Sequence, residues 1–453
     1  MSINTLLEMC ELIVDCPHST PKWTDSGFTV LRNQAIKKGS LNLKDCSFTD
    51  ELNFNARIKR AAPKSGDIVI TREAPMGEVC KIPDNLICCL GQRQVLLRPK
   101  HDVDADYLLY VLQSKKVQEQ ILWNEGTGST VSNLRIPVLE RLEIPRFGRF
   151  EKTIGEILKS LDDKIHLNNQ INKTLESIAQ AIFKSWFIDF EPVRAKIAAK
   201  QEGKDPELAA MCAISGKAQA ELDQLTKEDF AELQATAALF PDELVESELG
   251  EVPRAWAIGE LKDLIDFNPK RTLKKDSLAL YLDMKNVPTQ GHLVDEVIWR
   301  NMSSGTKFIN GDTLLARITP CLENGKTAYV DFLSNNEVGW GSTEFIVLRP
   351  RDPLPVSLGY FLARQDNFRT LAIQSMTGTS GRQRANADNL ANQLWLIYPK
   401  RLLIEFDKYS GKYLKKAKIN GQQNRVLKSL RDTLLPKLLS GEMDMLLLRQ
   451  EGA

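Results

Sequence analysis

The chain has 453 residues, of which 42% are hydrophobic and 26% charged, so its length and composition predict roughly two to four globular domains. No run of about 18 apolar residues occurs, which excludes a transmembrane helix, and the net charge of +1 excludes a uniformly basic nucleic-acid-binding chain. The acidic start MSINTLLEMCELIVD is unlike a signal peptide, and the eight scattered cysteines without a CxxC pair are typical of reduced thiols, so we expect a cytoplasmic protein.

Residues 1–149 predict one domain of mixed α/β type. Short apolar runs bounded by Gly and Pro are typical of buried strands, and apolar residues spaced by three and four predict an amphipathic helix. In chain order the predicted elements are the strands DIVIT (67–71) and QVLLR (94–98), the helix YLLYVLQSKKVQEQIL (107–122), the Gly/Thr/Ser loop GTGSTVSNL (126–134) and an apolar strand within LRIPVLERLEIP (134–145). The strand order cannot be predicted from these runs.

A long helix is predicted over residues 150–197. Its apolar residues recur at steps of three and four, and neither Gly nor Pro occurs between Glu156 and Asp189. This pattern is typical of a coiled coil, and the polar Asn168 in its apolar seam favours a role in setting register. A helix of about 35 residues spans roughly 50 Å.

Residues 198–250 carry the acidity of the chain, with 4 basic and 12 acidic residues. The segment is rich in Ala, Glu and Gln and helical at intervals. We interpret it as a solvated acidic connector, with docking of another protein as the alternative.

Residues 251–405 repeat the first domain. GDTLLARITP, which starts at Gly311, corresponds to GDIVITREAP, which starts at Gly66, and FIVLRP (345–350) corresponds to QVLLRP (94–99). A predicted helix (360–375), a polar loop (377–390) and an apolar strand ending in Pro (390–399) follow in the same order. The sequence therefore predicts a duplicated unit, one globular domain followed by one helix.

The second predicted helix covers 406–441 and leads into a tail, 442–453. Asn420 and Asn424 lie in its seam, and Gly421 weakens it by roughly 1 kcal/mol. Two such helices at matched positions predict an antiparallel pair. The predicted fold class is α/β (α+β), with two similar mixed-sheet domains separated by two long helices that form an antiparallel coiled coil.

Motifs of catalysis and metal binding are missing. The sequence has no GxxxxGK[ST] loop, no GxGxxG after a strand, no HExxH, no GxSxG and no Cys/His cluster, and its four histidines are far apart. We therefore predict no catalytic residue, no metal site and no cofactor in this chain.

The order and duplication of these motifs resemble the specificity (S) subunits of type I restriction–modification enzymes. The stretches that carry the resemblance are GDIVITREAPMGEV with QVLLRP, GDTLLARITPCLENGKTAYV with EFIVLRP, FKSWFIDFEPVRAK (183–196) and LGEVPRAWAIGELKDLI (249–265). The chain departs from the family where Phe150-Glu151 and Phe406-Asp407 replace an EQ-type helix entry, which leaves the exact helix starts open.

The resemblance implies a target recognition domain over 1–149 and another over 251–405, each reading one half of a bipartite, asymmetric DNA site. It implies that the helices set the gap and dock two modification (methyltransferase) subunits, which bind S-adenosylmethionine and methylate adenine. Restriction subunits would add translocation and cleavage with ATP and Mg²⁺. DNA half-sites on one face lie about 34 Å apart, a separation that a helix pair can hold.

Side chains that hydrogen-bond base edges, and hydroxyls or amides of Gly-rich loops that bind phosphates, are the candidates for DNA contact. In the first domain they are Thr71, Arg72, Gln92, Arg93, Gln94, Thr127, Gly128, Ser129, Thr130 and Asn133. In the second they are Arg317, Thr319, Ser342, Thr343, Thr377, Thr379, Ser380, Arg382, Gln383, Arg384 and Asn386.

Some candidates have a plain structural reading as well. GTGST could be an ordinary surface turn. Arg72 and Arg317 recur at one repeat position, which favours a shared structural role or a phosphate contact over base reading. The alternative for the whole chain is a non-catalytic scaffold whose two similar domains bind proteins across a helical spacer.

Overall fold

The computed structural model describes residues 2–123, 133–378, 383–440 and 442. Backbone contacts divide the chain into two compact units. Unit 1 comprises Met1–His166 with Asn424–Ala453, and unit 2 comprises Leu167–Gln423. The division falls inside both long helices, so each unit contains part of each helix.

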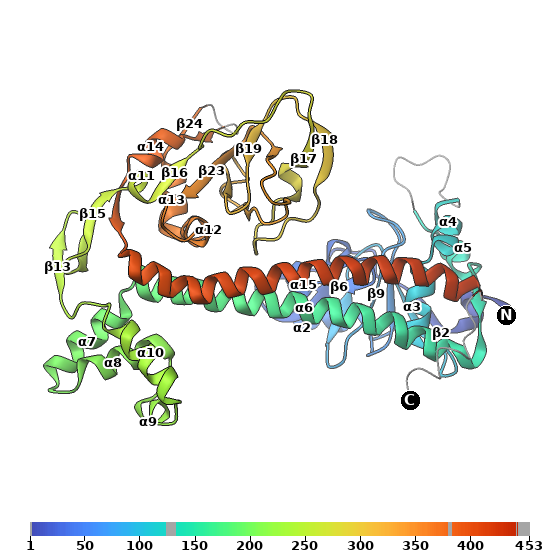
Figure 1. Cartoon of the computed structure of the whole chain (residues 1–453). Coiled ribbons are helices and arrows are strands. Elements are labelled where there is room, and N and C mark those ends of the chain that lie inside the picture. Colours follow the sequence, from blue (N-terminus) through green and yellow to red (C-terminus); the bar gives the residue numbers. More distant parts are fainter. Residues whose placement is uncertain (1, 124–132, 379–382, 441, 443–453) are drawn as a thin grey trace. The chain divides into compact units, whose positions relative to one another are not determined.

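The central sheet of unit 1 has four antiparallel strands in the order β2-β11-β8-β9, of which Figure 1 labels β2 and β9. These strands are β2 (Cys10–Asp15), β11 (Gln94–Pro99), β8 (Ile68–Thr71) and β9 (Val79–Lys81). Alternate residues of β8 and β11 face opposite ways: Ile70 and Leu97 join the core that includes α3 (Ala105–Gln113), whereas Val69 and Leu96 join a separate core on the other side. Burial on both faces explains why these strands read as continuous apolar runs.

The second sheet of unit 1 is mixed, in the order β10-β4-β7-β3, with β10 parallel to β4. Its strands are β10 (Cys88–Leu90), β4 (Phe28–Leu31), β7 (Ser47–Thr49) and β3 (Trp23–Thr24). The remaining short elements of the unit are β1 (Ser2–Thr5), α1 (Leu6–Met9), β5 (Ile36–Lys37), β6 (Ser40–Leu41), α2 (Glu51–Arg57), α4 (Lys115–Trp123), α5 (Ile136–Glu140) and β12 (Glu143–Arg146).

Unit 2 repeats the central sheet in the same order, β16-β23-β20-β21. These strands are β16 (Ile265–Phe267), β23 (Phe345–Pro350), β20 (Thr313–Ala316) and β21 (Thr327–Tyr329). Its second sheet, β18-β17-β22-β19, again holds one parallel pair, β17 with β22. These strands are β18 (Ile298–Asn301), β17 (Leu278–Leu282), β22 (Gly339–Gly341) and β19 (Thr306–Phe308).

The repeated scaffold differs at the edges of the second sheet. Unit 1 extends it by β3 beyond β7, whereas unit 2 extends it at the other end by β19 beyond β22. Unit 2 also has the short elements β13 (Leu244–Ser247), β14 (Gly250–Pro253), β15 (Ala257–Glu260), α11 (Leu261–Leu264), α12 (Ser357–Ala363), α13 (Asp366–Gln374), β24 (Met376–Thr377), β25 (Arg384–Ala385), α14 (Ala387–Ala391) and β26 (Leu394–Ile397). The strand order of the central sheet is thus the same in both units, whereas the edge strands of the second sheet differ.

In both domains the predicted helix and the last predicted strand are shorter than expected. In the second domain, Gln365 with its extended backbone separates α12 from α13, and only Leu394–Ile397 of the predicted strand is a strand. The helix predicted over 107–122 is two helices, α3 and α4, because Ser114 between them has an extended backbone. The strand predicted within 134–145 begins as α5, whose first turn holds Pro137, and only Glu143–Arg146 is a strand. Proline is favoured in the first helical turn, so the apolar run starts helical rather than extended.

The long helices are α6 (Glu151–Phe187) and α15 (Lys400–Ser440), and within each unit their segments lie side by side and run antiparallel (Figure 1). In unit 2, Asn168 donates to Gln423 at 2.8 Å, Asn420 donates to Asn172 at 2.7 Å, and both asparagines are buried. In unit 1, Arg431 of α15 donates to Asp162 of α6 at 2.7 Å. The predicted polar seam is confirmed at Asn168 and Asn420.

The ends of these helices differ from the predicted bounds. α6 ends at Phe187, because Phe190 has a left-handed backbone and a new helix, α7 (Glu191–Gln201), starts behind it. α15 begins at Lys400, before Phe406, and the carbonyl of Pro399 accepts a hydrogen bond from Leu403 at its start.

The acidic connector is folded rather than extended. After α7 come α8 (Pro206–Ser215), α9 (Gln219–Leu222) and α10 (Lys227–Ala237), and buried Met211, Leu222 and Ala237 form a small core of their own. Lys196 is buried beneath them and donates to Glu207 at 2.6 Å and to the Phe240 carbonyl at 2.8 Å. This paired lysine ties α7 to α8.

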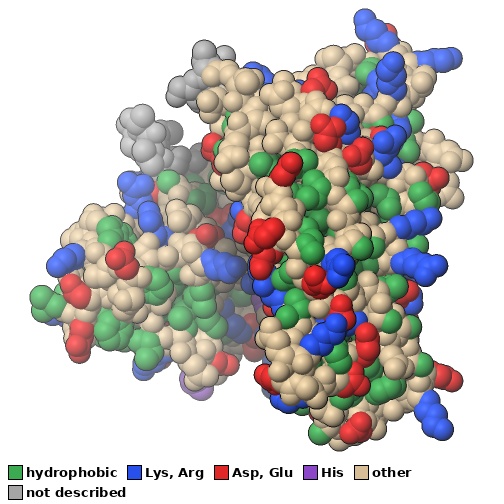
Figure 2. Space-filling view, turned by 90° about the vertical axis from the view of Figure 1, so that its left-hand side faces the viewer, with side chains coloured by type: hydrophobic (Ala, Val, Ile, Leu, Met, Phe, Trp, Pro, Cys, Tyr) green, Lys and Arg blue, Asp and Glu red, His purple; other side chains and the backbone are tan. Residues whose placement is uncertain are grey.

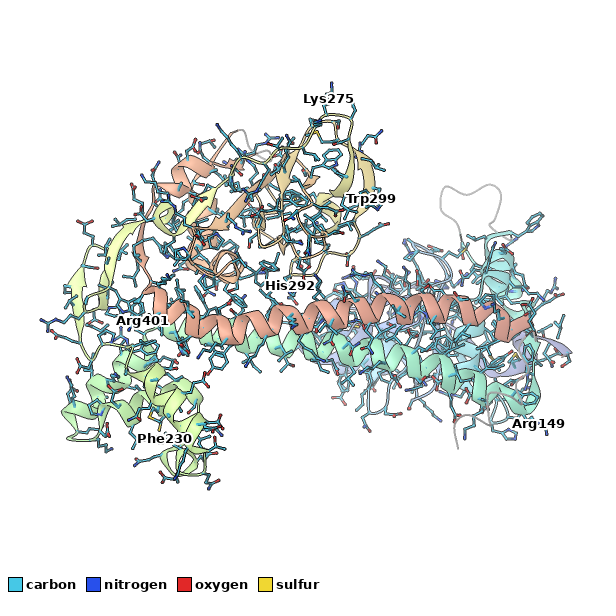
Figure 3. All side chains as sticks on the ribbon, in the orientation of Figure 1. Arg149, Phe230, Lys275, His292, Trp299 and Arg401 are labelled. Atoms are coloured by element: carbon cyan, nitrogen blue, oxygen red, sulfur yellow. The ribbon has the colours of Figure 1, made fainter. Side chains whose placement is uncertain are left out.

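A buried polar network joins the second domain to both long helices within unit 2. Glu176 of α6 accepts hydrogen bonds from Tyr360 of α12 and, at 3.1 Å, from Tyr413 of α15. Arg364 donates to the Tyr360 hydroxyl at 3.2 Å, and the Nδ1 of His292 lies 3.3 Å from the Tyr413 hydroxyl. Figure 3 shows His292 on the side of the domain that faces α15. The network therefore fixes the domain on the helix pair.

Buried thiols make unit 1 sensitive to alkali. Burial raises the pKa of Cys10 and Cys88 to about 12 and that of Cys89 to about 11, from an ordinary value of 9.0. The folded state therefore keeps protons that the unfolded state releases, so stability is complete below about pH 9 and falls as the pH rises above it. We expect the melting temperature to decline between pH 8.5 and pH 10, with a smaller decline in a variant with all three cysteines replaced by alanine. An equal decline in both proteins would contradict the prediction.

Candidate DNA interface

Arg72 follows strand β8 and is buried in the first domain. Its Nη1 donates to both carboxylate oxygens of Asp15, at 2.9 and 2.8 Å, its Nε donates to the Leu134 carbonyl at 2.9 Å, and its Nη2 donates to the Asn133 side chain at 3.2 Å. Every nitrogen of this guanidinium thus has a partner inside the domain. The sequence left a structural role and a phosphate contact open for the repeated arginine, and the contacts of Arg72 favour the structural role.

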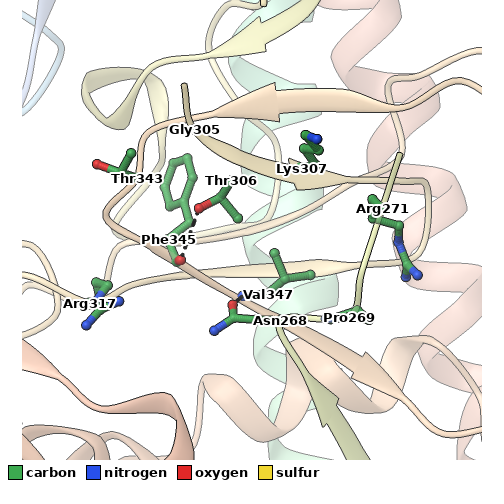
Figure 4. A pocket seen from close by; sticks show the side chains of 10 residues that line it. All are labelled: Asn268, Pro269, Arg271, Gly305, Thr306, Lys307, Arg317, Thr343, Phe345 and Val347. Atoms are coloured by element: carbon green, nitrogen blue, oxygen red, sulfur yellow. Dashed lines mark hydrogen bonds between the residues drawn. The ribbon is translucent and has the colours of Figure 1, made fainter. Parts of the chain in front are cut away.

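Arg317 occupies the matching position after β20 and lines a pocket of about 290 Å³. Its buried Nε has no hydrogen-bond partner among the residues that the structure describes. Figure 4 shows Arg317 and Thr343 on one side of the pocket and Lys307 and Arg271 on the other, with Phe345 and Val347 between them. The pocket therefore gathers three cations around a partly apolar floor.

The other candidates of the first domain differ in burial and in how far their hydrogen-bonding groups are used inside the domain. Thr71 and Gln94 are completely buried: Thr71 accepts a bond from the Glu78 amide at 3.0 Å, and Gln94 donates to the Leu31 carbonyl at 3.2 Å. Neither has exposed surface to offer a base. Gln92 is half-buried and donates to the His18 carbonyl at 2.7 Å, and Arg93 is exposed beside Glu73 at 3.1 Å. These two can still reach a ligand.

In the second domain, too, some candidates are used in local structure and others remain exposed or half-buried. Asn386 caps α14 by accepting bonds from two backbone amides, at 2.9 and 3.0 Å. Arg384 is exposed and forms a two-pronged pair with Glu344, at 2.8 to 3.0 Å. The further candidates with an exposed or half-buried position are Thr319, Ser342, Thr343, Thr377 and Gln383.

Seven candidates lie outside the described residues. They are Thr127, Gly128, Ser129, Thr130, Thr379, Ser380 and Arg382. They remain predictions from the sequence.

Sequence reasoning missed an aromatic and basic edge in each domain. On the edge strand β18 of unit 2, Trp299 is 59% exposed, and Arg300 next to it lies over the ring of Tyr281 at 4.9 Å. Figure 3 shows Trp299 and Lys275 on the same outer rim. On the edge strand β3 of unit 1, Trp23 is 44% exposed with Arg32 over its ring at 5.4 Å. The adjacent Trp and Arg of IWRN (298–301) could have indicated this edge in the second domain, but they lie outside the repeated motifs.

Charge alone does not mark the interface. On the face shown in Figure 2, basic and acidic side chains are interspersed rather than gathered by sign. Among the described residues, no cluster of three or more His, Cys, Asp or Glu side chains could hold a metal ion. In the same part of the chain, none of the helices is both long and apolar enough to cross a membrane.

Comparison with known proteins decides the family. Residues 16–177 match the family described as type I restriction modification DNA specificity domain. Over 425 residues the chain is 30% identical to the type I restriction enzyme HindI specificity subunit of Haemophilus influenzae, which covers 88% of this chain and 91% of that protein. The chain belongs to the type I restriction enzyme specificity subunits.

A second relative agrees with this assignment, and one solved structure shares the fold. The MjaIX specificity subunit of Methanocaldococcus jannaschii is 26% identical over 425 residues, 90% of this chain and 83% of that protein. The S subunit of a type I restriction–modification system from M. genitalium has the same fold, with a TM-score of 0.52 at 14% identity over 96% of this chain and 95% of that one. The predicted fold class is confirmed. A specificity subunit is the non-catalytic part of its enzyme, in agreement with the missing catalytic motifs.

Proposed function

We propose that this specificity subunit reads a bipartite, asymmetric DNA sequence, one half with each globular domain. The observation that carries the proposal is the repeated scaffold with different borders. Both domains have the same central sheet order, whereas their second sheets end in different edge strands, each with its own exposed Trp. A shared central sheet with different edge strands suits two domains that recognise different DNA sequences.

The partners follow from the same proposal. The chain would work in a complex with two modification (methyltransferase) subunits, docked on the α6 and α15 helices, and with restriction subunits. S-adenosylmethionine, ATP and Mg²⁺ would be bound by those subunits rather than by this chain. The complex would act in the cytoplasm, where its DNA lies.

Methylation mapping of genomic DNA from the source cell tests the proposal. We expect a split, adenine-methylated motif in cells with this gene, its loss after deletion and its return with a complementing copy. Methylation that is unchanged by deletion would refute the proposal.

Single substitutions can assign the halves of the motif. In a complementing copy, Trp299→Ala is expected to relax one half of the methylated motif, since it removes an exposed stacking surface from the second domain only. Trp23→Ala serves as the matched variant and is expected to relax the other half. If both variants altered the same half, the proposal that each domain reads a different half would be wrong.

A further inference from the structure

The two repeated arginines sit on the same backbone scaffold. The Arg72 amide donates to the Arg93 carbonyl at 2.8 Å, and the Arg72 carbonyl accepts from Leu134 at 3.0 Å. The Arg317 amide donates to the Glu344 carbonyl at 2.9 Å, and its carbonyl accepts from Ala385 at 2.8 Å. The two side chains therefore start from equivalent places, and their different surroundings come from neighbouring residues.

The strand registers identify the neighbour that differs. In unit 1, Ile13 lies opposite Leu97 of β11, and in unit 2, Phe267 lies opposite Leu348 of β23, the repeat counterpart of Leu97. Two residues further along, β2 continues to Asp15 opposite Val95, whereas β16 ends at Phe267 and the chain leaves the sheet at Asn268, whose backbone is left-handed, so that Pro269 stands at the position counted from the strand. The carboxylate that neutralises Arg72 is thus missing from the second domain, and Pro269 lines the pocket instead.

The pocket keeps an excess of unneutralised donors. The Nε atoms of Arg317 and Arg271 are buried without a partner among the described residues, and a buried charged donor that is left unpaired destabilises the folded state. Asp312 offsets Arg271 in part, at 3.1 Å, but it also accepts from Arg349 at 3.3 Å. Lys307 adds a third cation and Thr343 an exposed hydroxyl, and no carboxylate is among the described residues that line the pocket.

We infer that this pocket of the second domain binds one phosphate of the DNA backbone, and that the first domain lacks the equivalent contact because Asp15 occupies Arg72. The inference rests on the proposed DNA-binding function. Cations with hydroxyls are the groups that proteins use for phosphate oxygens. Arg317 follows β20 on the repeated scaffold, as expected of a contact that positions DNA without reading its sequence, whereas Lys307 lies on β19, the edge strand by which unit 2 differs.

The test measures DNA binding by the complex of this subunit with its modification subunits over a range of salt concentrations. We expect Arg317→Ala to weaken binding about 10-fold, by the same factor on the methylated motif's sequence and on a duplex with one half scrambled. The slope of log affinity against log salt should fall in magnitude by about 0.9, one phosphate contact. Arg369→Ala, which removes an equal charge from α13, should leave the slope unchanged.

Pro269→Asp is the second variant and adds a carboxylate to the lining of the pocket, as a counterpart to Asp15 in the first domain. It should reduce the salt slope like Arg317→Ala while the melting temperature stays at or above that of the wild type. A loss confined to the cognate sequence would mean that Arg317 reads a base, and an unchanged slope in both variants would mean that the pocket does not meet DNA; either result overturns the inference. Wild-type complex without any sequence preference would instead refute the proposed function.

Discussion

Arg72→Ala is expected to destabilise unit 1 by about 3–5 kcal/mol. The substitution leaves the largely buried Asp15 carboxylate with only the exposed His18 imidazole, 3.1 Å away, beside it, and removing one member of a buried ion pair strands the other charge. The Leu134 carbonyl and the Asn133 side chain lose their donor at the same time. The contacts of the central sheet with Asn133 and Leu134 would be lost first.

Hydrogen–deuterium exchange of β2, β8 and β11, together with thermal unfolding, would measure this effect. Arg317→Ala is the matched control, because it truncates the same repeat position where the side chain has no described partner to lose. We expect faster exchange in the central sheet of unit 1 for Arg72→Ala and little change in unit 2 for Arg317→Ala. Equal effects of the two substitutions would show that the surroundings of the two arginines do not differ as described.

Glu176→Ala is expected to destabilise the attachment of the second domain to its helices by roughly 2–5 kcal/mol. The change removes the carboxylate that accepts from two buried hydroxyls, those of Tyr360 and Tyr413, of which the second keeps only the Nδ1 of His292 at 3.3 Å, and an unsatisfied buried donor costs about 1–3 kcal/mol. Burial already raises the pKa of both tyrosines, so neither can lose its proton to escape the penalty near neutral pH.

Denaturant unfolding with exchange readout on α12 and α15 would report the loss. Glu176→Gln keeps the shape and one acceptor oxygen, so we expect it to cost less than half as much as alanine. If glutamine and alanine were equally destabilising, the carboxylate charge rather than hydrogen-bond satisfaction would hold the network together.

The sequence predicts the duplicated scaffold well because each turn and strand of it is specified by residues that are adjacent in the chain. GDIVIT and GDTLLAR carry a turn and a buried strand in adjacent residues, and the alternate burial of β8 and β20 needs such continuous apolar runs. The antiparallel helix pair was equally accessible, since each helix carries a polar interruption in its apolar seam, Asn168 in one and Asn420 in the other. The breaks at Ser114 and Phe190 were not, because backbone angles at those residues depend on tertiary packing.

The candidate site was harder to predict because its character depends on residues far apart in the chain. Arg72 and Arg317 have the same local motif, yet Asp15 lies 57 residues from Arg72 and decides its role. The repeat gave no reason to inspect Pro269, Arg271 or Lys307. Burial likewise removed Thr71 and Gln94 from consideration, because the hydrogen-bonding capacity that made them candidates is used inside the domain.

The pairing of α15 with α6 has a consequence for the order in which the protein is made. Leu438 and Leu439, near the end of α15, pack in the same core of unit 1 as Leu6, Met9 and the strands of its central sheet. A ribosome releases the N-terminal domain long before it reaches these leucines, so the earliest-synthesised core stays open until translation of the last long helix is complete. Nascent chains would therefore expose the apolar side of that domain throughout synthesis of unit 2, and a premature stop codon before residue 438 would leave it permanently open.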